Sequence, residues 1–198
     1  LIQNDTKTCP DTGMAGASRS LYMDGNATII AANKLLAAMR KEDGTLRTYD
    51  EMKAEGIETK YLGRYETNTT PGLCRLDPNT GIGDPTPAFT YCLNLAEVEV
   101  DTKTGKTTVL KFTCVDFVGR IGNIDAVNGQ AYSGIMHGIG FALKEDYADV
   151  KKHANMFGAG TSYIKDVPDD IDLIHIDGAI SDGPFGSSGA SEAFQASG

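Results

Sequence analysis

The stretch LAEVEVD at residues 95–101, followed by TKTG at residues 102–105, decides how this chain folds. Apolar and acidic residues alternate along the first segment, which is the pattern of a strand with one face buried. TKTG is a turn segment, and residues 106–118 beyond it are again rich in β-branched and aromatic residues. We therefore predict an antiparallel hairpin from residues 89–101 and 106–118.

A glycine-containing helix is predicted further along the chain, opening at residues 128–131 and ending at residue 143. Ile135, Ile139 and Leu143 lie on an apolar face, and Gly134, Gly138 and Ala142 form a bare stripe beside it. Each glycine costs a helix up to about 1 kcal/mol relative to alanine. Something must pack closely against the stripe, and we expect this to be the sheet.

Two shorter segments complete the C-terminal part. Residues 144–153 are predicted to be a charged, exposed continuation of that helix, and residues 172–177 a short alternating strand. Hairpin, helix and strand together predict an α+β fold in which an antiparallel sheet is packed with helices.

The N-terminal part reads as two helices and a strand. Apolar residues recur at helical spacing within residues 21–40, and residues 48–51 form a capping box that leads a short helix ending at Gly56. Residues 58–65 are predicted to be a strand. Residues 70–87 form a Pro/Gly-rich connection, which is long for a compact domain.

Composition restricts the partners of this 198-residue chain. Its 40% hydrophobic and 23% charged residues are ordinary for a globular protein, and its formal net charge of −9 disfavours nucleic acid and anionic membranes as partners. No apolar run approaches the roughly 20 residues that span a bilayer. We expect a cytoplasmic location.

The cysteine and histidine residues lie too far apart in the sequence for neighbouring residues to form a metal site. Cys9, Cys74, Cys92 and Cys114 show no close pair, so free thiols are expected. The histidines at positions 137, 153 and 175 are expected to serve packing or the surface.

Small, polar residues concentrate in DGPFGSSGASE at residues 182–192, which ends in the carboxylate Glu192. Glycine allows backbone to approach a ligand, and a carboxylate in a partly dry site is a plausible proton acceptor. A flexible tail is the alternative reading.

A similar segment, MAGASRS, lies at residues 14–20, where Ser18 is a candidate N-cap and the amides of the helix start could hold an anion. Gln130 is a third candidate, because its amide both donates and accepts hydrogen bonds.

In this order and spacing the three segments resemble the second portion of the molybdopterin-binding region in the xanthine dehydrogenase/aldehyde oxidase family of molybdenum hydroxylases. The resemblance covers nearly the whole chain and is strongest to bacterial aldehyde oxidoreductases. YDEMK at residues 49–53, DVKKHA at residues 149–154 and GPFG at residues 183–186 carry it. It implies that residues 1–198 are the C-terminal portion of a molybdopterin-binding domain, as a fragment or subunit of a larger enzyme.

The resemblance also implies the cofactor and its contacts. The cofactor would be molybdopterin, expected as the cytosine dinucleotide, with molybdenum held through the pterin dithiolene rather than by protein ligands. Glu192 would be the active-site base. The expected cofactor-binding residues are Gly16, Ala17, Ser18, Arg19, Ser20, Gln130, Ser188, Gly189, Ala190 and Ser191.

The implied reaction is oxidation of an aldehyde to a carboxylic acid, with water as the oxygen source. Expected partners are the first half of the molybdopterin-binding region and iron–sulfur clusters on another domain or subunit, because this chain lacks the cysteine spacing for clusters. Three alternatives stay open: a purine or N-heterocycle hydroxylase of the same family, a catalytically silent scaffold or fragment, and a phosphate-ligand module at residues 18–20.

Overall fold

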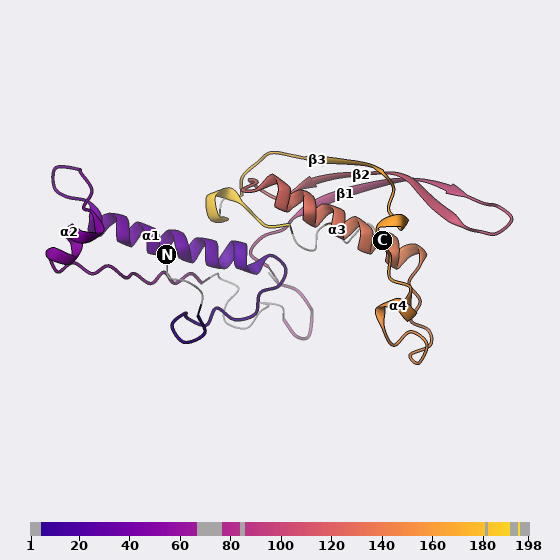
Figure 1. Cartoon of the computed structure of the whole chain (residues 1–198), viewed down its shortest axis with the longest axis horizontal. Coiled ribbons are helices and arrows are strands. Elements are labelled where there is room, and N and C mark those ends of the chain that lie inside the picture. The colour runs from indigo at the N-terminus through magenta and orange to yellow at the C-terminus, as the bar shows by residue number, and fades with distance from the viewer. Residues whose placement is uncertain (1–4, 67–76, 84–85, 181, 191–193, 195–198) are drawn as a thin grey trace. The chain divides into compact units, whose positions relative to one another are not determined.

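The computed structural model describes residues 5–66, 77–83, 86–180, 182–190 and 194. The chain divides into two compact units, residues 1–85 and residues 86–198. Figure 1 labels their helices and strands. The two units are described separately below.

The second unit is built on a three-stranded sheet in the order β1-β2-β3. β1 (Tyr91–Val100) pairs antiparallel with β2 (Thr107–Phe117), which confirms the predicted hairpin. β3 (Asp170–His175) joins the other edge of β2 in parallel, so the sheet is mixed rather than wholly antiparallel. The parallel pairing is possible because the long connection from β2 to β3 carries a helix, as parallel strands require.

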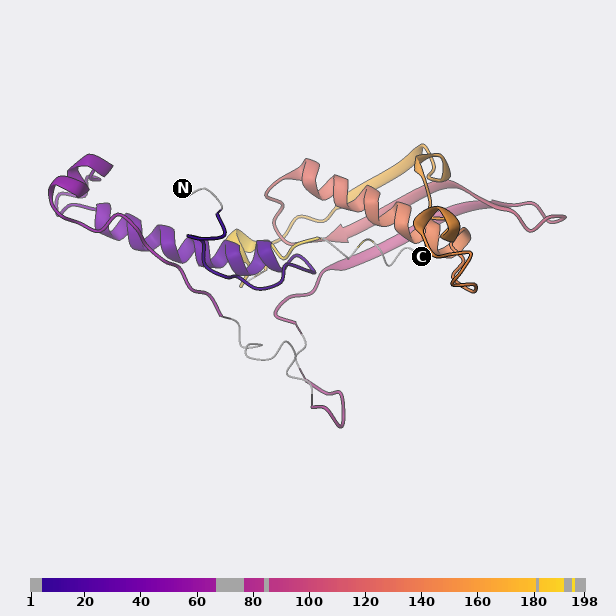
Figure 2. The same ribbon diagram turned by 60° about the horizontal axis from the view of Figure 1, so that its bottom comes forward.

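That connection contains α3 (Ile124–Leu143), which lies along the sheet in both views of the ribbon (Figures 1 and 2). The prediction that the helix opens at residue 128 was wrong. The N-cap is Asn123, whose Oδ1 accepts a hydrogen bond from the backbone N–H of Ala126 at 3.0 Å. Gly129 and Gln130 therefore lie within the helix, because the cap sets the start and the glycine does not interrupt it.

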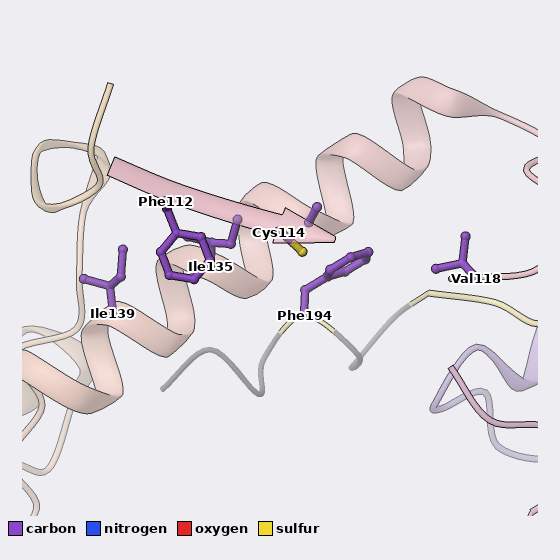
Figure 3. Close-up of a cluster of buried hydrophobic side chains, with 7 residues drawn as sticks. Phe112, Cys114, Val118, Ile135, Ile139 and Phe194 are labelled. Atoms are coloured by element: carbon purple, nitrogen blue, oxygen red, sulfur yellow. The ribbon is translucent and has the colours of Figure 1, made fainter. Parts of the chain in front are cut away.

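The core of this unit lies between β2 and α3. Phe112 and Cys114 of β2 face Ile135 of α3, and the ring of Phe194 lies beside Cys114 (Figure 3). The predicted apolar face of the helix is confirmed at Ile135 and Ile139, which are buried, and was wrong at Leu143, which is exposed at the end of the helix. Full burial of side chains of this size stabilises a fold by about 1.5–3 kcal/mol each.

The glycine stripe of α3 packs closely at Gly134, as predicted, but the neighbour there is Phe194 and not the sheet. A Cβ at Gly134 would meet Phe194, and one at Gly140 would meet the hydroxyl of Ser162. Ser162 also donates a hydrogen bond from Oγ to the carbonyl of Met136 at 2.7 Å. Segments that follow α3 in the sequence therefore pack closely against both glycines.

Beyond α3 the chain forms short elements. The expected helical continuation over residues 144–153 was wrong, because Lys144 leaves helical geometry at φ −133°. The elements that follow are α4 (Met156–Ala159), the 3-10 turn η2 (Ile164–Asp166), β3, and the 3-10 turn η3 (Pro184–Gly186).

The first unit contains a π-helical turn, η1 (Ser20–Asp24), that continues into α1 (Gly25–Met39), and a short helix, α2 (Tyr49–Ala54). The predicted capping box of α2 is confirmed. The N–H of Glu51 donates to Thr48 Oγ1 at 3.2 Å, and the N–H of Thr48 donates to Glu51 Oε2 at 2.7 Å.

The predicted strand over residues 58–65 was wrong. This segment runs along α1 instead, where Lys34 Nζ donates to the carbonyl of Leu62 at 2.8 Å. A Cβ at Gly63 would lie 1.8 Å from the carbonyl oxygen of Ala27, so only glycine permits this approach. The described residues of this unit offer no strand as a partner for it, so its alternating side chains pack against a helix.

Candidate cofactor-binding site

The glycine-rich segment near the C-terminus is an ordered loop over its described residues, 182–190, and not a flexible tail. The N–H of Ser188 donates to the carbonyl of Val118 at 3.0 Å, and the N–H of Arg120 donates to the carbonyl of Gly186 at 2.9 Å. Ser187 Oγ donates to the carbonyl of Arg120. Ser187 and Ser188 are each only 8% exposed. The loop is thus bound to the chain that leaves β2.

Thr90, just before β1, holds the other side of the loop. Its Oγ1 donates to the carbonyl of Gly189 at 2.8 Å and lies 3.5 Å from Ser188 Oγ. Gly119 permits the approach of the loop, because a Cβ there would fall 2.5 Å from the carbonyl oxygen of Gly186. Two of the predicted contacts, Ser188 and Gly189, therefore occupy a loop fixed on both sides by the hairpin.

Gln130 occupies the second turn of α3, and its side chain is exposed. The prediction placed this residue at the helix start, and this position was wrong because α3 begins at Ile124. Its actual position leaves the carboxamide on the helix surface, available to a ligand. The next residue, Ala131, points into the core and is fully buried, so this turn of the helix is held firmly.

The segment at residues 16–20 belongs to the first unit and forms a tight turn before η1. Ala17 and Ser18 have φ angles of 51° and 58°, which are uncommon for residues other than glycine. The N–H of Arg19 donates to the carbonyl of Gly16 at 2.9 Å. The predicted N-cap role of Ser18 was wrong, because the N-cap is Arg19 and it makes no side-chain cap hydrogen bond.

Two predicted site residues, Ser191 and Glu192, lie outside the described residues. Ala190, directly before them, is half-buried and packs against the core. The assignment of Glu192 as the base stays a prediction. The structure brings residues 187–189 together with Thr90 and the end of β2.

Sequence reasoning missed a buried polar cluster of Asp116, His175 and Asn128. Asp116 Oδ2 lies 2.6 Å from His175 Nδ1, and His175 Nε2 lies 2.7 Å from Asn128 Oδ1. Asp116 is 1% exposed, and its Oδ1 has no hydrogen-bond partner in the described structure. Burial raises the pKa of Asp116 above its ordinary value, while the hydrogen bond to His175 opposes the rise.

A signal for this cluster was present in the strand pattern. Asp116 follows Phe112 and Cys114 at intervals of two, so it continues the buried face of β2. A carboxylate at such a position needs a partner. The partner could not be identified from sequence, because His175 lies 59 residues away and meets Asp116 only through the parallel pairing of β2 and β3.

The described cysteines Cys92 and Cys114 are free thiols, as predicted. The Sγ atoms of Cys92 and Cys114 lie 3.4 Å apart, and burial raises the pKa of the Cys114 thiol. Within the described part of the chain, no three His, Cys, Asp or Glu side chains are grouped to hold a metal ion. None of the described helices has the length and apolar character needed to cross a membrane.

Comparison with known proteins gives consistent matches. A family model described as "Molybdopterin cofactor-binding domain" matches residues 1–168. The aldehyde oxidoreductase of Megalodesulfovibrio gigas is 43% identical over 188 residues, which covers 95% of this chain and 20% of that protein. "Probable hypoxanthine oxidase XdhD" of Escherichia coli K12 is 31% identical over 207 residues, which covers 97% of this chain and 22% of that protein.

Solved structures agree with the sequence matches. The aldehyde oxidoreductase of Desulfovibrio desulfuricans superposes with a TM-score of 0.90 at 43% identity, over 99% of this chain and 21% of that one. This chain therefore spans about one fifth of the length of these relatives. The chain belongs to the molybdopterin cofactor-binding domain family, within the xanthine dehydrogenase/aldehyde oxidase group of oxidoreductases.

Proposed function

We propose that this chain is part of a molybdenum hydroxylase that oxidises aldehydes to carboxylic acids with water as the oxygen source. The observation that carries the proposal is the similarity to bacterial aldehyde oxidoreductases along nearly the whole chain. Because the chain spans about one fifth of those proteins, it would work only together with the rest of such an enzyme.

The described candidate residues fit a pterin with phosphate groups. Such a cofactor offers many hydrogen-bond donors and acceptors, and the chain presents the exposed carboxamide of Gln130 to it. In the first unit, Arg19 and the small residues beside it are suited to phosphate, because a guanidinium binds phosphate in a bidentate way. We infer the cytosine dinucleotide form from the resemblance to bacterial relatives.

The residues of the chain would have separate tasks. Gln130 would orient the pterin through hydrogen bonds, and the fixed loop at residues 187–190 would enclose the cofactor on one side and exclude water. Glu192 would accept a proton during attack on the substrate carbonyl carbon, as a general base. When bound, the molybdenum cofactor would supply the redox centre that takes up the electrons of the substrate.

The partners follow from the same proposal. The first half of the molybdopterin-binding region would complete the site, and iron–sulfur clusters on another domain or subunit would carry the electrons away. The match to "Probable hypoxanthine oxidase XdhD" favours a second candidate, hydroxylation of a purine ring. The two reactions share the cofactor and the base and differ in substrate.

The experiment that tests the proposal is elemental analysis of the complete enzyme, purified from its native source with its copurifying chains. About one molybdenum per chain, with turnover of short aldehydes exceeding that of hypoxanthine, is the expected result. Faster turnover of hypoxanthine than of aldehydes would overturn the aldehyde reaction and support hydroxylation of a purine ring. A complete assembly without molybdenum would overturn both and leave a silent scaffold.

A further inference from the structure

The buried cluster of Asp116, His175 and Asn128 joins three elements of the second unit. Asp116 is the next-to-last residue of β2, His175 is the last residue of β3, and Asn128 lies in α3. The imidazole contacts the carboxylate through Nδ1 at 2.6 Å and the amide oxygen through Nε2 at 2.7 Å. A single ring therefore links the edge of the sheet to the helix through both of its nitrogens.

Packing alone does not require polar residues at this place. Along β2 and β3 the preceding pairs on the same face are apolar, Phe112 opposite Ile171 and Cys114 opposite Leu173, and then Asp116 lies opposite His175. Burying a carboxylate is unfavourable unless its partners compensate for the lost hydration. The side chain of Asp116 is fully buried and that of His175 is 12% exposed. Burying this polar pair costs free energy that an apolar pair would not cost. Its hydrogen bonds, unlike apolar contacts, fix the orientation of the imidazole.

Within the second unit, the cluster is connected to two described parts of the candidate cofactor site, the glycine-rich loop and Gln130. Asp116 precedes by two residues Val118, whose carbonyl accepts the N–H of Ser188. Asn128 precedes Gln130 by two residues on the same helix. A shift of the imidazole would thus be transmitted to the glycine-rich loop on one side and to the carboxamide of Gln130 on the other.

We propose that Asp116, His175 and Asn128 are a positioning unit, which fixes α3 against the ends of β2 and β3 and so holds Gln130 and Ser188 in the orientation that the cofactor requires. None of the three residues touches the cofactor in this proposal. Their effect is transmitted through Val118 and through α3. The inference rests on the proposed function.

The test compares variants in the complete enzyme. His175→Phe keeps a ring of similar size and removes both hydrogen bonds, and Asn128→Leu removes only the link to α3. Both are expected to lower molybdenum content per folded chain and kcat by about 10-fold or more, the size of effect that outer-shell residues have at metal sites. Asp116→Asn keeps a hydrogen-bond partner for His175 and is expected to retain most of both.

Ser162→Ala is the matched control for general destabilisation. It removes a different buried hydrogen bond to α3, the one from Ser162 Oγ to the carbonyl of Met136. Molybdenum content and kcat of the folded control are expected to stay at the wild-type level. An equal loss in Ser162→Ala, or wild-type values in folded His175→Phe and Asn128→Leu, would overturn the positioning role. If His175→Phe fails to fold, Asn128→Leu decides alone.

A cofactor-independent measurement separates this inference from the proposed function. Hydrogen exchange in peptides covering residues 118–122 and 124–131 is expected to quicken several-fold in Asn128→Leu and not in Ser162→Ala. This result would hold even if the wild-type assembly contained no molybdenum, in which case the proposed function alone would fail. Unchanged exchange in both peptides would overturn the positioning unit.

Discussion

Gly134 on α3 lies against Phe194, so closely that a Cβ added at Gly134 would fall 2.4 Å from the Cβ of Phe194. Phe194 is completely buried, and its ring lies beside Cys114 in the core (Figure 3). Phe194 follows Glu192 by two positions in the sequence. Gly134 thus packs against the residue that lies two positions beyond Glu192, the proposed base.

Gly134→Ala should destabilise the protein by about 1–3 kcal/mol, because the added methyl overpacks a filled core. Gly129→Ala on the same helix is the control. A Cβ there meets nothing within 4 Å, so this change should stabilise the helix by up to about 1 kcal/mol. Chemical denaturation followed by circular dichroism measures both. Equal stability of the two variants would contradict the packing of Phe194 on Gly134.

Local patterns account for the parts of the fold that were predicted correctly. The hairpin of β1 and β2 and the capping box of Thr48 and Glu51 depend on residues close in sequence. The strand expected at residues 58–65 was wrong because alternating apolar and polar residues indicate only that one side of a segment is buried. Here that side is buried against α1 and not in a sheet. The start of α3 was missed because the cap at Asn123 precedes the visible apolar periodicity.

The sequence predicted those parts of the candidate site that are rich in small residues. The loop at residues 182–190 could be chosen from its composition, although its hydrogen bonds to Val118 and Arg120 depend on tertiary contacts. His175 was assigned to packing or the surface because its partners, Asp116 and Asn128, are distant in sequence. Buried polar pairs of this kind depend on strand order and register, which a single sequence does not display.

Glu192→Gln in the complete enzyme should retain molybdenum and lower kcat by about 10²–10⁴-fold, the usual contribution of a general base. Glutamine has the same size and can still form hydrogen bonds, so the cofactor should stay bound. Glu99→Gln, at an exposed position on β1, is the control and should leave turnover unchanged. Steady-state kinetics and elemental analysis together check the result. Turnover near the wild-type level would remove Glu192 as the base.

Asp116→Asn should change how stability depends on pH. Burial raises the pKa of Asp116 above its ordinary value of 3.8, so the folded protein binds this proton more tightly than the unfolded chain. The stability from this group is therefore fully present below pH 3.8 and is lost as the pH rises through the folded pKa. Asparagine resembles the protonated acid and does not ionise.

The free energy of unfolding of Asp116→Asn, relative to wild type, should accordingly increase as the pH rises from below 3.8 toward neutrality. Urea denaturation at a series of pH values measures this difference. Asp177→Asn is the control, because that exposed carboxylate lies two residues beyond His175 and outside the cluster. A difference that is constant with pH, or that falls, would show that the pKa of Asp116 is not raised.

Glu51 should make the protection of α2 sensitive to acid. The hydrogen bond from Lys41 and the backbone N–H of Thr48 hold the pKa of Glu51 at about 2, below its ordinary 4.5. A depressed pKa gives stability that is present above pH 4.5 and is lost as the pH falls toward 2. Amide protection over residues 48–56, corrected for the intrinsic pH dependence of exchange, should decline across that window.

Glu51→Gln should remove the decline, because glutamine still completes a capping box but carries no charge for Lys41. Thr48→Ala, which removes the cap acceptor and costs about 1 kcal/mol, sets the scale for loss of the cap at every pH. Glu58→Gln, an exposed carboxylate outside the helix, should behave as wild type. Protection in wild type that stays constant from pH 4.5 to 2 would mean that the carboxylate of Glu51 does not hold the start of α2.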